Sequence, residues 1–250
     1  MGIGTAASRK GALIVNADDW GRDALNTDRT LDCFVRGTVT AVSAMVFMED
    51  SERAADIARE KGIDVGLHLN FTTRFSGRRV SDSLVRHLEK TSRYLGNHRL
   101  AQVIFHPGLA SSFRYLVESQ LDEFGRIYGT KPKRLDGHHH MHLCANVLFS
   151  GLLPYGTTVR RNFSFLPGEK SLANRTYRRT LDAILARHHN LTDYFFSLPP
   201  LSPVSRLQRI FALAKESCVE VETHPVLPEE YAFLTGNEAL QLAAEVCHRT

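Results

Sequence analysis

Arg134-Leu135-Asp136-Gly137-His138-His139-His140-Met141-His142 is the stretch of the chain richest in metal-binding and proton-transfer side chains. Four of the twelve histidines fall within five consecutive positions, two residues after an aspartate. We interpret Lys133 to His140 as a β-strand, in which side chains two positions apart point the same way. Asp136, His138 and His140 would then share one side, and two imidazoles at this spacing are typical of a metal site.

Three other short polar stretches are predicted to lie beside the histidine stretch: Asn16–Asp19, Gly66–Asn70 and Glu222–Pro225. Each follows or ends an apolar run that we interpret as a strand. Parallel strands present their carboxyl ends at one edge, where α/β proteins place their active sites. The same alternation pairs Asn16 with Asp18, His68 with Asn70, and Glu222 with His224.

Strand and helix patterns alternate along most of the chain, which predicts an α/β fold with parallel strands and helical crossovers. About seven candidate strands favour a single (β/α) barrel-like domain with its active site at the carboxyl ends of the strands. A doubly wound open sheet is the alternative that the pattern leaves open. Strands are predicted at 12–16, 41–47, 65–71, 133–140, 157–160, 193–198 and 219–223, and helices at 23–36, 51–60, 83–93, 112–128, 172–188, 206–215 and 237–248.

The length of 250 residues suits one domain at 11–250, preceded by a flexible tail at 1–10 and carrying an insertion around 72–110. A hydrophobic share of 43% and a charged share of 23% are those of a globular protein. The net charge of +4 is too small to predict a nucleic-acid partner. Four scattered cysteines, no signal peptide and no membrane-spanning run predict a cytoplasmic protein.

Asp18 and Asp19 can reach one site only if the strand ends there and Asp19 belongs to the turn. Two carboxylates in one site are costly unless a cation compensates them, and a divalent metal ion would do so. Candidate residues in these stretches also have simpler explanations. Asp19 could cap a helix, His68 could be a core histidine, and His224 could be part of a turn. The joint occurrence at four strand ends favours a site. His139 is predicted to face away from it, and His142 has no assignment.

Four motifs resemble those of the YdjC-like carbohydrate deacetylases, the family that includes chitooligosaccharide deacetylase. They are Val15–Gly21, Gly66–His68, Leu135–His142 and His224–Pro225, in family order and spanning about residues 12–226. Trp20 stands where the family usually has Phe, and Gly137 where it usually has Ser. The resemblance implies a barrel-like fold, a divalent metal ion, and hydrolytic removal of the acetyl group from an N-acetylated sugar.

The resemblance also implies roles for individual residues. Asp19, His68 and His138 would bind the metal ion, Asp18 would be the catalytic base, and His224 the general acid. Zinc suits one carboxylate and two imidazoles, and magnesium or another divalent ion is an alternative. Residues expected to bind substrate or to orient these groups are His140, Asp136, Glu222, Asn70 and Arg160.

Two arginine-rich stretches bear on the substrate. They contain Arg74, Arg78, Arg79, Arg86 and Arg93, and Arg160, Arg161, Lys170, Arg175, Arg178 and Arg179. Arginine side chains bind phosphate well, so one hypothesis is that the substrate is a nucleotide- or lipid-linked sugar. The alternative is that these arginines only form solvated faces of helices. The rival functions are hydrolysis of another amide or an ester, and metal or saccharide binding without turnover. A homodimer is compatible with the sequence.

Overall fold

The computed structural model describes residues 11–97, 100–165 and 170–247, so the predicted tail at 1–10 lies outside the described residues. Its centre is a sheet of seven parallel strands in the order β5-β4-β3-β2-β1-β7-β6. The strands are β1 (Ala12–Trp20), β2 (Ala41–Ala44), β3 (Asp64–Leu69), β4 (Arg134–Gly137), β5 (Thr158–Val159), β6 (Tyr194–Ser197) and β7 (Cys218–Thr223).

This order is the chain order around a ring, with one seam between β5 and β6. Backbone hydrogen bonds bridge the seam, among them Val159 N–H to Asn190 O at 2.9 Å, Asn190 N–H to Thr157 O at 3.0 Å, and Ser164 N–H to Phe195 O at 2.7 Å. A doubly wound sheet would instead reverse its strand order at a switch point. The prediction of a single α/β barrel-like domain is therefore confirmed.

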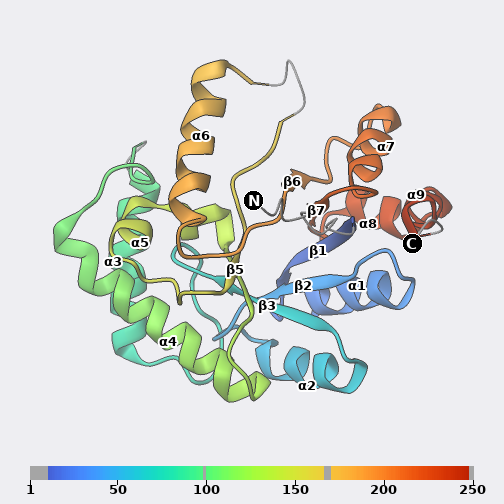
Figure 1. Cartoon of the computed structure of the whole chain (residues 1–250). Helices are drawn as coiled ribbons and strands as arrows, with labels where there is room; N and C mark the ends of the chain where they lie inside the picture. The colour runs from blue at the N-terminus through green and yellow to red at the C-terminus, as the bar shows by residue number, and fades with distance from the viewer. Residues whose placement is uncertain (1–10, 98–99, 166–169, 248–250) are drawn as a thin grey trace, which may run out of the picture.

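Helices surround the sheet, and α6 rises away from it (Figure 1). None of the helices in the described part of the chain is long and apolar enough to cross a membrane. The α-helices are α1 (Ala24–Val35), α2 (Ser51–Lys61), α3 (Asp82–Asn97), α4 (Ala110–Tyr128), α5 (Ala145–Phe149), α6 (Leu172–Leu185), α7 (Val204–Leu213), α8 (Pro228–Thr235) and α9 (Asn237–Cys247), and the 3-10 helices are η1 (Pro107–Leu109) and η2 (His138–Leu143).

Local sequence signals set several helix ends. The Asp23 carboxylate accepts a hydrogen bond from Asn26 N–H and so caps α1. Gly62 and Gly129 end α2 and α4 in the left-handed conformation, at φ 64° and 70°. The predicted insertion contains α3, which packs against α4. Helices α5 and α8 were not predicted.

Alternation along the strands separates an apolar outer face from a polar interior. Leu67 and Leu69 of β3 belong to the buried apolar core, whereas His68 between them is one of the polar residues buried inside. The inward set is made up of Asn16, Asp18, Ser43, His68, Asp136, Glu220 and Glu222, and all of these residues are buried. Burying so many polar groups requires that each finds a partner, and the interior is therefore a network of hydrogen bonds.

The strand predicted at 133–140 is wrong in its second half, because β4 ends at Gly137 and η2 begins at His138. The chain turns sharply there, and His139 and His140 have left-handed φ values of 54° and 57°. Close approach of the backbone makes this possible: a Cβ on Gly137 would lie 2.9 Å from His142 N. His138 and His140 therefore do not share a side by strand alternation.

The predicted end of the first strand also needs correction. β1 continues to Trp20, with an irregularity in its pairing with β2 between Ala17 and Trp20. Asp19, within this irregularity, has a left-handed φ of 63°. Its carboxylate thereby escapes strict alternation and reaches the same cavity as that of Asp18.

Candidate active site

Asp19, His68 and His138 form a buried cluster whose potential ligand atoms all lie within 4.8 Å of one another. Asp19 Oδ1 lies 2.9 Å from His138 Nδ1 and 3.4 Å from His68 Nε2. Both Asp19 Oδ1 and His68 Nε2 are buried without a hydrogen-bond partner among the described residues. Such an orphaned polar atom costs about 1–3 kcal/mol, and a cation between the two would satisfy both. One carboxylate and two imidazoles form a donor set that suits a divalent metal ion such as zinc.

The second nitrogen of His68 fixes the orientation of its ring. His68 Nδ1 lies 2.7 Å from Asp136 Oδ1, which leaves Nε2 facing the cluster. Burial lowers the pKa of His68, but Asp18 and Asp136 outweigh it and raise the pKa to about 9. A carboxylate behind a ligating histidine is the usual arrangement at metal sites. A metal ion would replace the extra proton on this imidazole.

The second carboxylate oxygen of Asp19 faces an arginine, which also favours the ionised form. Arg22 Nη1 donates to Asp19 Oδ2 at 2.8 Å. Burial raises the pKa of Asp19, but the adjoining imidazoles of His138 and His68 outweigh it and hold that pKa well below its ordinary value. The carboxylate is therefore available as an anionic ligand.

Asp18 belongs to a second group, with Glu222 and His224, whose potential ligand atoms also lie within 4.8 Å of one another. The Arg160 guanidinium donates to both Asp18 oxygens, at 2.7 and 2.8 Å. Burial raises the pKa of Asp18, but Arg160 and His68 outweigh it and hold that pKa well below its ordinary value. Asp18 is therefore an ionised carboxylate in a fixed orientation.

Arg160 lies beneath the site and contacts carboxylates from several strands. Besides Asp18 it donates to Glu220 at 2.7 Å and to Glu222 at 3.2 Å, and its Nη2 lies 2.8 Å from Asp136. The residue is only 3% exposed. Arg160 therefore orients site carboxylates and has no free face toward a substrate phosphate.

Glu222, a member of the Asp18 group, lies next to His140 in the wall of the cavity. His140 Nε2 lies 3.4 Å from Glu222 Oε2, and the His140 ring packs edge-on against Phe163. Burial and the nearby Asp18 carboxylate raise the pKa of Glu222 well above its ordinary value. Burial and Arg160 lower the pKa of His140 to about 3. His140 is thus neutral at neutral pH.

His224 stands half-buried at the rim of the same cavity. Its backbone N–H donates to Glu230 Oε2 at 2.8 Å, and Thr223 Oγ1 donates to the same oxygen at 2.6 Å. These bonds fix the chain as it leaves β7. Two residues of this network were not predicted: Glu230, and Ser43, whose hydroxyl donates to Asp136 Oδ2 at 2.5 Å.

Asn70 was expected in the site, whereas His139 was expected to face away from it and His142 had no assignment. The Asn70 side chain accepts from the N–H groups of Thr72 and Thr73, so it shapes the loop after β3. His139, expected to face away, lines the cavity because of its left-handed backbone. His142 is buried, with Nε2 3.0 Å from Arg160 O.

The two groups open into one cavity of about 410 Å³. It exposes both the Asp19–His68–His138 cluster and the Asp18 group to a ligand, whereas Asp136 and Arg160 lie behind them. The residues that line it are Asp18, Asp19, Arg22, His68, Gly137, His138, His139, His140, Glu222, His224, Val226 and Leu227.

Residues 12–245 match the family described as YdjC-like protein. A carbohydrate deacetylase of Mus musculus is 31% identical over 171 residues, which are 65% of this chain and 52% of that protein. A chitooligosaccharide deacetylase of Proteus mirabilis (strain HI4320) is 31% identical over 134 residues, 52% of this chain and 50% of that protein. The chain thus spans about half the length of the curated relatives it matches.

A crystal structure from Enterococcus faecalis V583 shows the same fold. It covers 95% of both chains with a TM-score of 0.65 at 18% identity.

Proposed function

Because the chain belongs to the YdjC-like family, we propose that it is a metal-dependent hydrolase that removes the acetyl group from an N-acetylated sugar. The observation that carries this proposal is the buried Asp19–His68–His138 cluster with its two orphaned ligand atoms. The names of the curated relatives, carbohydrate deacetylase and chitooligosaccharide deacetylase, support the choice of an N-acetylated sugar.

Asp19, His68 and His138 would hold the metal ion, and zinc is the ion we propose. When bound, such an ion supplies a Lewis acid and a water whose pKa falls from ~15.7 toward ~7. Asp18 is ionised and fixed by Arg160, so it can accept the proton of the attacking water.

His224 would donate the proton to the leaving amine. It stands at the cavity rim, where its ring can reach a ligand while its backbone is held by Glu230. Glu222, in the same group and with its pKa raised well above the ordinary value by burial, lies where its carboxyl group can form a hydrogen bond with His224. Each proton-transfer group is typically worth about 10²–10⁴ in rate.

Acetate release from N-acetylglucosamine oligomers, with and without a chelator, tests the proposal. We expect equimolar acetate and free amine, lost with the chelator and restored by zinc. Release from O-acetylated sugars or non-sugar amides alone would show another ester or amide hydrolase. Metal and saccharide binding without any acetate from these substrates would show a protein without turnover.

A further inference from the structure

Arg22 lies in the wall of the candidate active-site cavity and forms two hydrogen bonds with Asp19. Its guanidinium Nη1 donates to Asp19 Oδ2 at 2.8 Å, and its backbone N–H donates to Asp19 O at 3.1 Å. The other carboxylate oxygen, Asp19 Oδ1, is buried without a hydrogen-bond partner among the described residues. The two oxygens of one carboxylate therefore differ: an arginine occupies the first, and the second faces the two imidazoles of the cluster.

The turn from Asp19 to Arg22 is held in place by the packing of the two residues between them. The Trp20 side chain is fully buried, and Gly21 has a left-handed φ of 82°. A Cβ on Gly21 would lie 3.2 Å from Ala54 Cβ, so the turn lies directly against α2. The fold therefore sets the position of Arg22 relative to Asp19, and the bond to Oδ2 does not depend on a mobile loop.

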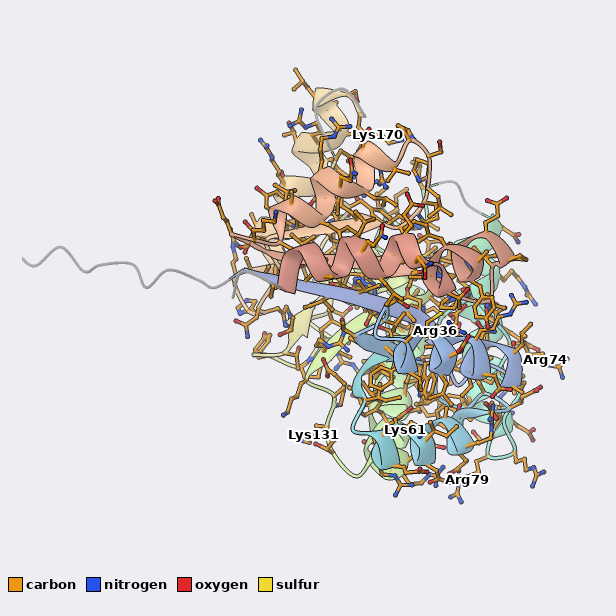
Figure 2. The ribbon with its side chains drawn as sticks, turned by 90° about the vertical axis from the view of Figure 1, so that its right-hand side faces the viewer. Arg36, Lys61, Arg74, Arg79, Lys131 and Lys170 are labelled. Atoms are coloured by element: carbon orange, nitrogen blue, oxygen red, sulfur yellow. The ribbon has the colours of Figure 1, made fainter. Side chains whose placement is uncertain are left out.

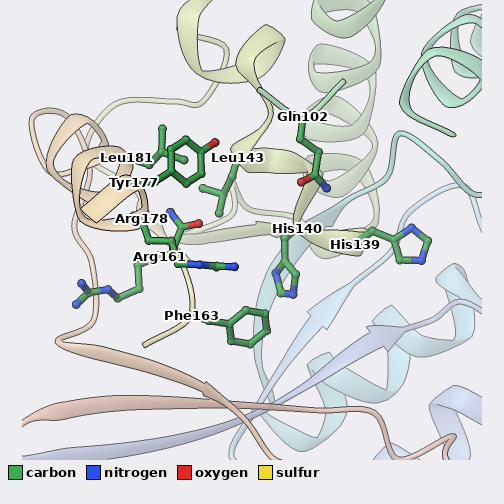
Figure 3. A pocket seen from close by; sticks show the side chains of 10 residues that line it. Gln102, His139, His140, Leu143, Arg161, Phe163, Tyr177, Arg178 and Leu181 are labelled. Carbon is green, nitrogen blue, oxygen red and sulfur yellow. The ribbon is translucent and has the colours of Figure 1, made fainter. Parts of the chain in front are cut away.

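Within the described ranges of the chain, Asp19 is the only carboxylate that forms an ion pair with Arg22. Beyond Arg22 the cavity wall continues with His139, which also lines a smaller cavity of about 150 Å³. Figure 3 shows that smaller cavity, and the residues that line it include no aspartate or glutamate. No acid on that side competes for the guanidinium. Arg22 therefore serves one carboxylate, in contrast to Arg160, which contacts several.

We propose that Arg22 is a positioning residue that occupies Asp19 Oδ2 and leaves only Oδ1 for the metal ion. This inference rests on the proposed function, because it requires that Asp19, His68 and His138 bind the ion. One carboxylate oxygen and two imidazoles match the small ligand number that zinc takes. Manganese and calcium prefer more oxygen ligands, and calcium often takes both oxygens of one carboxylate. Arg22 therefore disfavours ions that prefer oxygen ligands.

Removal of Arg22 changes metal binding in two ways that a single Kd cannot separate. Loss of the positive charge strengthens the binding of all divalent ions alike, because the guanidinium repels each of them. Release of Asp19 Oδ2 instead favours the ions that take more oxygen ligands. The ratio of the Kd values for two divalent ions cancels the first effect and retains the second. The ratio of the Kd for manganese to the Kd for zinc is therefore the quantity that tests the proposal.

Competition with a chromophoric chelator measures both Kd values on the full chain. We expect Arg22→Met to lower the manganese-to-zinc ratio about 10–100-fold, the usual size of effect for a partner of a metal ligand. Arg22→Lys should keep the wild-type ratio, because a single nitrogen forms the bond to Oδ2. Arg36→Met is the matched control, an arginine at the end of α1 that is paired with Asp32 at 3.0 Å outside the cavity (Figure 2). An unchanged ratio in Arg22→Met would overturn the proposal.

Cobalt(II) supplies a second measurement, because its visible absorption weakens as its coordination number rises. The wild type and Arg22→Lys should give intense bands, and Arg22→Met should give weaker bands because Oδ2 joins the ligands. Equal band intensities in Arg22→Met and the wild type would overturn the proposal. The Arg22 side chain is 35% exposed, so both variants should fold as the wild type does, and circular dichroism checks this.

Metal binding and acetate release together separate this proposal from the proposed function. If the wild type binds neither zinc nor manganese, metal-dependent hydrolysis and the role of Arg22 both fail. If zinc binds and acetate is released but Arg22→Met keeps the wild-type ratio, only the role of Arg22 fails. A ratio that depends on Arg22, without acetate release from any acetylated sugar, would overturn only the proposed function.

Discussion

Asp18 and Asp19 are adjacent in sequence, yet their carboxylates have different partners. Asp19 faces His68 and His138, whereas Asp18 is paired with Arg160. Strand alternation would place them on opposite sides, and only the left-handed backbone at Asp19 brings both to one cavity. The sequence therefore predicts that both residues belong to a site, but their separate roles come from the family pattern and from the observed contacts.

Asparagine at each position should separate the two roles. We expect Asp19→Asn to lose bound zinc, because it removes the anionic ligand. Asp18→Asn should keep zinc and lower kcat by about 10²–10⁴-fold, as for loss of a general base. Metal content by atomic absorption and kcat by acetate release check this, with the exposed Asp28→Asn as control. Zinc lost from Asp18→Asn and kept in Asp19→Asn would mean that the roles are exchanged.

Secondary-structure elements were predictable where local chemistry decides them. The helices predicted at 23–36, 51–60 and 112–128 match α1, α2 and α4, whose ends are set locally by Asp23, Gly62 and Gly129. The end of β4 was not, because the turn at His138 depends on contact with the end of β3, which is distant in sequence. Helix α5 is only five residues long and offers too little periodicity to be recognised.

Gly137 tests this account of the turn after β4. A Cβ there would lie 2.9 Å from His142 N and 3.1 Å from Leu69 O, both backbone atoms. We therefore expect Gly137→Ala to lower the free energy of unfolding by about 1–3 kcal/mol, as overpacking does. Gly125→Ala is the control, since a Cβ there meets nothing within 4 Å inside α4. That change should stabilise the protein by up to about 1 kcal/mol in urea unfolding. Equal stability of both variants would contradict the account.

At the scale of the whole molecule, Arg160 joins carboxylates from opposite sides of the barrel. Asp18 lies on β1, Asp136 on β4, and Glu220 with Glu222 on β7. The sequence placed Arg160 at a strand end, and the surrounding arginines suggested a phosphate ligand. Its burial could not be predicted, because it depends on how the barrel closes around it.

Removal of Arg160 should therefore weaken the whole fold as well as the site. We expect Arg160→Met to lower the free energy of unfolding by about 3–5 kcal/mol, because it leaves buried carboxylates without their counter-charge. Urea unfolding measures the change, and Arg187→Met, exposed at the far end of α6, is the control. A loss of less than about 1 kcal/mol would show that the carboxylates find other partners.

His142 makes the free energy of unfolding of the metal-free barrel depend on pH. Burial lowers its pKa from 6.5 to about 4, so the unfolded chain binds a proton that the folded chain excludes between these values. The contribution of His142 should therefore be full above pH 6.5 and fall as the pH drops toward 4, by about 2 kcal/mol at pH 5, and the lowered pKa of His140 adds to the same slope. His68, whose pKa is raised to about 9, contributes a constant amount below pH 6.5 and does not mask this slope. Urea unfolding at pH 7, 6 and 5 in chelator measures the slope for the wild type and for His142→Gln, which keeps a donor for Arg160 O. The glutamine variant should be less sensitive by the amount His142 contributes, and an unchanged slope would show that the buried imidazole is protonated in the folded protein.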